Sequence, residues 1–125
     1  DGTLVSYDQI FGIARFSVKG GFLNVPSHPM ILGTKRRLKI FASDVSLTWD
    51  GKHKSTIDNI LPVIVMDMQE TSSSQVTAIL SLGSDKAGDR ILARVTKRSW
   101  ETLGLEKDQN LFAQVKGVSL VRPDI

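Results

Sequence analysis

The sequence predicts an all-β protein made of short strands, and two observations support this class. Most segments are short, rich in β-branched and apolar residues, and bounded by Gly, Pro, Asn, Asp or Ser. Helical character is confined to one stretch, from Lys97 to Leu103, with Gly104 at the position of a C-terminal cap. We therefore expect about seven or eight strands, arranged as barrels, and one short helix.

The expected strands follow one another with few residues between them. In chain order they are IARFSV (13–18), FLNV (22–25), RRLKIFASDVSLTW (36–49), NILPVIVMDM (59–68), SQVTAILSLG (74–83), DRILARV (89–95) and NLFAQVKGVSLV (110–121). The first two are separated by Gly20 and Gly21, which indicates a tight hairpin. Pro62 cannot donate a backbone hydrogen bond, so we expect it at a sheet edge or a bulge.

The chain also contains two copies of one unit. LGTKRRLKIFASDVSL (32–47) matches LEKDQNLFAQVKGVSL (105–120) at a constant spacing of 73 residues. We expect a first half over 1–49, a linker over 50–57 and a second half over 58–125. A unit of this size buries only a marginal core alone. The halves should therefore pack on each other and exchange a strand.

Composition and motifs point away from catalysis. Hydrophobic residues make up 41% of the chain, the formal net charge is +3, and there is no cysteine. No phosphate-binding, nucleophile or dinucleotide motif occurs, so we expect no enzyme and no catalytic residue. His28 and His53 lack partners at metal-ligand spacing, so we expect no metal site. The mild basic excess fits an anionic partner without selecting one.

The start of the helix is the strongest candidate site. Thr96 is a good N-cap and Ser99 lies three residues later, with Lys97 and Arg98 between them. Free N–H groups at a helix start attract anions, so this turn is either a plain cap or an anion pocket. Lys116 would add a cation if its strand ended nearby.

A resemblance favours the pocket. RLKIFASDVSLTWDGKHKSTIDNILPVIV (37–65) resembles the junction in the C-terminal Mop/TOBE (di-Mop-like) domain of molybdate ABC importer ATP-binding subunits. ILARVTKRSWETLGLEKDQNLFAQVKGVSLV (91–121) is similar to the Mop repeat of that family, and YDQIFGIARFSVKGGFLNVP (7–26) is similar to its first half. The resemblance implies two tandem OB-like five-stranded barrels that dimerise and bind molybdate or tungstate between Mop units.

The resemblance also implies a set of anion contacts. They are Thr96, Ser99, Lys116, the backbone of Gly117, Thr56 and Asn59. Asp58 stands where the family carries an arginine, which puts a negative charge near a dianion. We expect weak or no molybdate binding for this reason, unless Asp58 points away and Lys52 or Lys54 supplies the charge. In the first half, VPSHP and IFA replace the hydroxyl pair and the lysine, so we expect no such site there.

The implied setting is a regulatory domain in the cytoplasm, at the inner face of the membrane. Its partners would be a second copy, an ATPase domain of the same polypeptide and, through the full protein, a membrane permease. We expect no cofactor and no nucleic acid. Because the chain opens with Asp1, we expect it to be part of a longer protein. Two alternatives stay open: a purely structural dimerisation domain that has lost its anion site, and a small β-barrel that binds nucleic acid.

Overall fold

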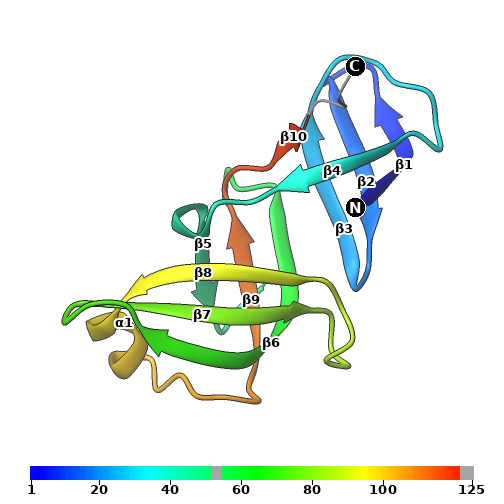
Figure 1. Ribbon diagram of the computed structural model, residues 1–125. Helices are drawn as coiled ribbons and strands as arrows, with labels where there is room; N and C mark the ends of the chain where they lie inside the picture. Colours follow the sequence, from blue (N-terminus) through cyan, green and yellow to red (C-terminus); the bar gives the residue numbers. More distant parts are fainter. Residues whose placement is uncertain (52–54, 122–125) are drawn as a thin grey trace.

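Ten strands, one short 3-10 helix and one α-helix make up the computed structural model, which describes residues 1–51 and 55–121 (Figure 1). The strands are β1 (Gly2–Asp8), β2 (Ile13–Val18), β3 (Gly21–Pro26), β4 (Lys35–Lys39), β5 (Val45–Thr48), β6 (Asn59–Glu70), β7 (Gln75–Leu82), β8 (Arg90–Thr96), β9 (Asn110–Val115) and β10 (Ser119–Val121). The helices are η1 (Ala42–Asp44) and α1 (Lys97–Thr102). The predicted all-β class with one short α-helix is confirmed.

The strands form two five-stranded antiparallel sheets that exchange strands with each other. The first sheet has the order β10-β4-β1-β2-β3 and the second has the order β5-β9-β6-β7-β8. β5 comes from the first half of the sequence but pairs with β9, and β10 comes from the second half but pairs with β4. Figure 1 shows the chain crossing between the two sheets at both places. The expected strand exchange is therefore confirmed, and it occurs in both directions.

Two of the expected strands are wrong in length, and the exchange is the reason. The run 36–49 is not one strand, because η1 separates β4 in the first sheet from β5 in the second. The run 110–121 is likewise divided into β9 and β10, which belong to different sheets. One uninterrupted strand cannot pair with neighbours in two sheets that have different orientations. The chain therefore bends at equivalent points of the repeat. These two divisions, together with β1, which was not among the expected strands, give ten strands in the described residues.

β6 is a central strand, but Pro62 lies in its first residues, which pair with β9 alone. The expected edge position therefore holds locally at Pro62, whereas the expected bulge does not. β6 pairs with β9 on one side and with β7 on the other, and Pro62 is opposite Phe112 of β9. The ladder with β7 begins only at Val63, opposite Leu82. Proline has no N–H to donate, and at this residue the β7 side of the strand requires none. The bulge in β6 occurs later, between Val65 and Asp67.

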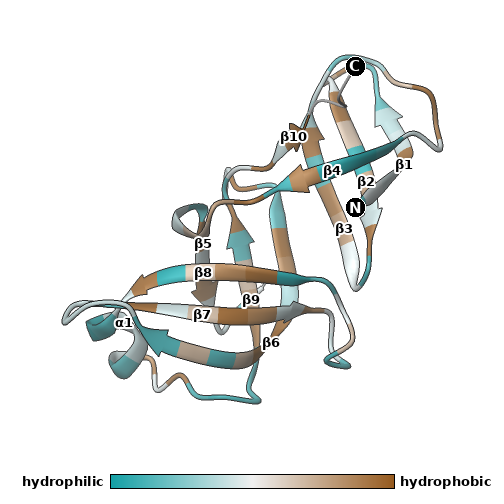
Figure 2. Ribbon diagram, viewed as in Figure 1, coloured by the Kyte–Doolittle hydropathy of each residue, from teal (hydrophilic) through white to brown (hydrophobic). Residues whose placement is uncertain are grey.

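The two sheets enclose cores of very different size. The larger cluster of buried side chains lies in the second sheet and comprises Val45, Val63, Val65, Val76, Ala78, Leu80, Leu82, Ile91, Ala93, Trp100, Leu105, Leu111, Ala113 and Val115. The smaller cluster, in the first sheet, comprises Leu4, Ala14, Phe16 and Val25. Val118, between β9 and β10, packs against both. Buried and exposed residues alternate along most of β8, so one of its faces lies on the core. Figure 2 shows an apolar stretch in this strand between hydrophilic residues.

The α-helix begins and ends where the sequence predicts. The hydroxyl oxygen of Thr96 accepts a hydrogen bond from the N–H of Ser99, which satisfies one of the unpaired donors of the first turn. Gly104 follows with a φ of +64°, a conformation that costs glycine little. Trp100 is the buried residue of the helix and anchors it on the second sheet. No helix in the described part of the chain is long and apolar enough to cross a bilayer.

Candidate functional site

The hydroxyl groups of Thr96 and Ser99 lie together at the start of α1. Oγ1 of Thr96 lies 2.8 Å from Oγ of Ser99 and 3.1 Å from the N–H of Ser99. If Thr96 donates its proton to Ser99, the hydroxyl proton of Ser99 is left to donate outward. Both residues are exposed. This pair can therefore present a hydrogen-bond donor to an anion while it caps the helix.

The two basic residues between them differ in their partners. Nζ of Lys97 lies 3.2 Å from a carboxylate oxygen of Glu70, and the N–H of Lys97 donates to the carbonyl of Ser74. Arg98 is exposed, and within the described residues its guanidinium has no ion-pair partner. Arg98 is thus the cation available beside the hydroxyl pair, although it is not among the contacts that the resemblance implies. Its position between Thr96 and Ser99 is the feature of the sequence that indicates a role for Arg98 at this site.

The other predicted contacts lie at the far end of β9. Val115, the last residue of β9, pairs with Val45 of β5 and with Asn59 of β6. Lys116 comes next, and its N–H donates to the carbonyl of Asp44 at 2.8 Å. Asp44 directly precedes β5 and Asp58 directly precedes β6, so the register places Lys116 between two acidic positions that adjoin the neighbouring strands. The lysine predicted to attract an anion thus has an acidic residue at each adjoining register position, although no ion pair joins Lys116 to either of them within the described residues.

Asp44 also reaches the backbone of Gly117. A Cβ atom at Gly117 would lie 3.3 Å from Oδ2 of Asp44, so the carboxylate is beside the predicted backbone donor. The repeat contains the signal for this contact, because Asp44 and Gly117 are separated by the same 73 residues that relate the two halves. A negative charge here opposes the binding of a dianion.

Asn59 joins the two sheets. It is 6% exposed, its Oδ1 accepts the N–H of Asn24 at 2.7 Å, and its Nδ2 donates to the carbonyl of Asn24 at 2.9 Å. The side chain thus pairs with the edge of β3 as a neighbouring strand would. Thr56, the other predicted contact in this segment, is exposed, and no contact of its side chain with another predicted residue is seen.

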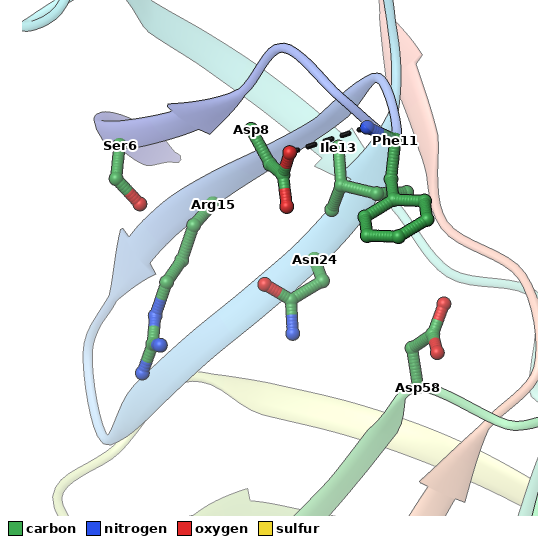
Figure 3. A pocket seen from close by; sticks show the side chains of 7 residues that line it. All are labelled: Ser6, Asp8, Phe11, Ile13, Arg15, Asn24 and Asp58. Atoms are coloured by element: carbon green, nitrogen blue, oxygen red, sulfur yellow. Dashed lines mark hydrogen bonds between the residues drawn. The ribbon is translucent and has the colours of Figure 1, made fainter.

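Asp58 lines an open hollow of about 590 Å³ between the two sheets (Figure 3). The other lining residues are Ser6, Asp8, Phe11, Ile13, Arg15 and Asn24. Figure 3 shows the Asp58 carboxylate directed toward Phe11 and the Asp8 carboxylate accepting the N–H of Phe11. The guanidinium of Arg15 lies 4.3 Å from the centre of the Phe22 ring. The hollow combines one cation with two carboxylates, which gives it no clear preference for an anion.

One chain does not bring the two groups of predicted contacts together. Thr96 pairs with Gln75 next to the end of β6, whereas Lys116 lies next to its beginning. At about 3.3 Å per residue, a strand as long as β6 spans roughly 30 Å or more along its path. Within the described residues, the hydroxyl pair and Lys116 share no contact. Lys52, His53 and Lys54 lie outside the described residues, as does the segment 122–125.

In the first sheet, the end of β3 corresponds to the end of β8 in the second sheet, but no helix follows it. β3 ends at Pro26, and the residues that follow form no helix before β4 begins at Lys35. The hydroxyl of Ser27 donates to the carbonyl of His28, and its N–H donates to the carbonyl of Gly12. Within the described residues, no group of three His, Cys, Asp or Glu side chains could hold a metal ion.

Comparisons with known proteins agree with this architecture. The chain is 44% identical over 122 residues to the molybdenum import ATP-binding protein ModC 2 of Bradyrhizobium diazoefficiens, which covers 98% of this chain and 14% of that protein. It is 42% identical over 120 residues to the molybdenum import ATP-binding protein ModC of Rhodopseudomonas palustris strain HaA2, with 96% and 32% covered. The chain thus spans a third or less of the length of these relatives.

A solved structure shares the fold over nearly the whole chain. It is the molybdate-bound form of the cytoplasmic molybdate-binding protein ModG, with a TM-score of 0.79 and 24% identity, and the match covers 98% of this chain and 93% of that one. The family model of the TOBE domain matches residues 55–121, which include all of the second sheet except β5. The chain therefore belongs to the TOBE domain family.

Proposed function

We propose that this chain is the oxyanion-binding and regulatory dimerisation domain of an ABC importer ATP-binding subunit, with molybdate or tungstate as ligand. Two findings support the proposal. The relatives that match almost the full chain are molybdenum import ATP-binding proteins, and the protein that shares its fold was solved with molybdate bound. The single observation in this chain that carries the proposal is the exposed hydroxyl pair of Thr96 and Ser99, with Arg98 beside it.

The chemistry of the ligand suits these donors. Molybdate at neutral pH is a dianion without a proton, so it accepts hydrogen bonds and donates none. The Ser99 hydroxyl, the Arg98 guanidinium, the Lys116 ammonium and the N–H of Gly117 are all donors. Thr96 holds the Ser99 hydroxyl in place, and Asn59 fixes the start of β6, which Asp58 directly precedes.

The binding site forms between two copies. In one chain the hydroxyl pair and Lys116 belong to opposite ends of β6, so a single copy offers only half of the donors at each place. A second copy can supply the other half, as in a shared interface. Dimerisation and anion binding are then coupled, because a ligand that bridges two copies stabilises their association.

The rest of the polypeptide supplies the other partners. The ATPase domain belongs to the same, longer polypeptide, and the full protein binds the membrane permease. The domain and the ATPase both lie at the cytoplasmic face of the membrane. The repeated units keep the limits 1–49 and 58–125, with 50–57 as the linker. No cofactor and no nucleic acid enter this function.

A second candidate is a purely structural dimerisation domain, and one observation favours it. The register places Lys116 between Asp44 and Asp58, and the Asp44 carboxylate lies beside Gly117, so acidic residues adjoin the predicted donors. A domain that had lost its ligand could keep the fold, the strand exchange and the dimer. The two candidates differ in anion binding alone.

Calorimetric titration of the purified domain with molybdate, tungstate, sulfate and phosphate distinguishes them. We expect weak binding of molybdate and tungstate, and Ser99→Ala and Lys116→Ala should each weaken it about tenfold or more. Thr102→Ala and Lys107→Ala are matched controls, because they remove an exposed hydroxyl and an exposed ammonium elsewhere in the second half. Light scattering should give twice the 13.7 kDa mass of one chain. A dimer that binds none of the four anions would favour the structural candidate.

A further inference from the structure

Two loops at one end of the first sheet expose large apolar side chains. Ile10 and Phe11, between β1 and β2, are 86% and 78% exposed. Ile31 and Leu32, between β3 and β4, are 83% and 62% exposed. Figure 1 shows both loops at the end of the first sheet that faces away from the second, and Figure 2 shows the apolar stretch in the β3–β4 loop. We call these four residues the apolar tips.

The apolar tips are held outward by ordered turns. Each pair is followed by a glycine in the left-handed region, Gly12 with φ +66° and Gly33 with φ +90°. The Asp8 carboxylate accepts the N–H groups of Ile10 and Phe11 at 2.9 and 3.2 Å. The N–H of Gly33 donates to the carbonyl of Leu4 at 2.8 Å, which fixes the second loop to β1. Side chains presented on such turns form a built surface, and exposed apolar groups of this size mark interaction sites.

The two loops are also joined to each other. The N–H of Ser27, at the start of the second loop, donates to the carbonyl of Gly12 in the first at 3.0 Å. The hydroxyl of Tyr7 donates to the carbonyl of Ser27 at 2.7 Å. The two loops that carry the apolar tips are therefore fixed to each other and to β1.

A row of cations begins beside these loops. β4 follows the second loop directly, and Lys35, Arg37 and Lys39 alternate along its outer face. Their cross-strand neighbours are Thr3, Val121 and Ser119, none of them acidic. Within residues 1–51 and 55–121, none of the three forms an ion pair. Nζ of Lys39 lies 4.8 Å from the centre of the Phe41 ring, so its charge is not neutralised.

The charge of the chain is divided unevenly. The segment from Gln9 to Ser43 contains six basic residues and no acidic one, although it covers most of the first sheet. All thirteen acidic residues and the other ten of the sixteen basic residues lie outside it. In a domain with a net charge of only +3, the basic excess of the first sheet is thus carried mainly by β4, whereas Asp8 and Asp58 line the hollow beside Phe11. A basic strand of this kind attracts an anionic surface.

We propose that the apolar tips and the cation row of β4 dock the first barrel on an anionic lipid surface. Apolar side chains on loop tips can enter the boundary between headgroups and acyl chains, and Lys and Arg beside them can pair with lipid phosphates. Two separated tips with an adjoining row of unpaired cations suit this partner better than a flat protein face. The inference does not depend on the oxyanion site, which lies in the second sheet.

Vesicle co-sedimentation tests the proposal. The domain should bind vesicles that contain phosphatidylglycerol, should not bind pure phosphatidylcholine, and should be released by salt. Lys35→Gln with Arg37→Gln should weaken binding roughly twenty- to thirtyfold, because each basic side chain near an anionic surface contributes about fivefold. Arg94→Gln with Lys107→Gln, an equal loss of charge in the second half, should have a much smaller effect.

The apolar tips have their own test. Phe11→Ser and Ile31→Ser should each weaken vesicle binding, whereas Leu92→Ser, an exposed leucine of β8, should not. In Phe11→Trp, the fluorescence of the new tryptophan should shift to the blue when anionic vesicles are added. No sedimentation of the wild-type domain at low salt, or no shift at position 11, would overturn the proposal. So would a dimer that dissociates in Phe11→Ser, because the tips would then contact a second copy.

Discussion

The two barrels come from one repeated unit, yet they differ in core, charge and termination. The second has fourteen residues in its buried cluster, whereas the first has four. The second continues β8 into a capped helix, whereas the first ends β3 at Pro26 without one. Both described ion pairs, Lys86–Asp108 and Lys97–Glu70, belong to the second. The second barrel thus has the larger core, the capped helix and the ion pairs, whereas the first has a sheet of the same size without them.

Strand exchange explains how the weaker barrel survives. A core as small as that of the first sheet is marginal alone. β10 completes the first sheet from the second half, β5 completes the second sheet from the first half, and Val118 packs on both cores. The two barrels should therefore unfold as one unit, and the stability of the first depends on the packing of the second.

The largest expected effect comes from the core of the second barrel. Leu80 is fully buried, so Leu80→Ala should lower the free energy of unfolding by about 2–5 kcal/mol through lost burial and a cavity. Urea denaturation followed by circular dichroism should show one transition at a lower midpoint, in which both sheets melt together. Leu103→Ala, at an exposed leucine, is the control and should change stability by less than about 0.5 kcal/mol. Two separate transitions would show that the barrels are independent.

The connection between the barrels should give the next effect. Asn59→Ala removes both hydrogen bonds to the backbone of Asn24 and leaves a partly buried N–H and C=O without partners. We expect a loss of about 1–3 kcal/mol. Asn110→Ala, at an exposed asparagine of β9, should cost less. Amide hydrogen exchange in β3 should become faster in Asn59→Ala alone, and unchanged exchange there would count against a link through Asn59.

The helix cap should give a smaller effect, confined to the second barrel. Thr96→Ala removes the acceptor for the N–H of Ser99 and should cost about 1 kcal/mol, measured by thermal or urea unfolding. Thr96→Ser keeps the hydroxyl and should restore most of that stability. If Thr96→Ser is as unstable as Thr96→Ala, the loss comes from the methyl group and not from the cap.

The smallest expected effect concerns a surface ion pair. The hydrogen bond from Lys86 lowers the pKa of the Asp108 carboxyl below its ordinary value, and the nearby charges of Lys86 and Lys107 act in the same direction. A lowered pKa in the folded state means that the pair stabilises the protein above the unfolded pKa and loses this effect as pH falls through the folded pKa. Because both side chains are exposed, the gain in stability is minor. Carboxyl NMR titration should show the Asp108 pKa rising in Lys86→Ala and unchanged in Lys97→Ala.

Much of this fold could be predicted from the sequence, because the capping residues and the repeat agree with the tertiary structure. Thr96, Ser99 and Gly104 delimit α1 by capping alone, the repeat at 73 residues indicates two units, and the small size of each unit predicts that they exchange a strand. The breaks at η1 and after Lys116 were not predicted, since apolar alternation continues through them while the chain changes sheets. The pairing of Asn59 with Asn24 depends on residues 35 apart that no local pattern connects.

The candidate site was less predictable than the fold for a related reason. Residue types indicate which groups could hold an anion, but the fold decides which groups meet. The sequence named Lys116 as a donor, and only the register of β5, β9 and β6 shows that Asp44 and Asp58 flank it. Nothing local indicates that the hydroxyl pair and Lys116 belong to opposite ends of β6.

Titration of the wild-type domain and of Asp58→Arg with molybdate, by calorimetry at low and high salt, tests the central claim most directly. The claim is that the second barrel carries an oxyanion site whose affinity is limited by acidic neighbours of Lys116. Replacing one of them with a cation should strengthen binding about tenfold or more, with an affinity that falls as salt rises. Addition of Lys116→Ala to this variant should remove the gain. Tight molybdate binding by the wild-type domain that Asp58→Arg leaves unchanged would contradict the account.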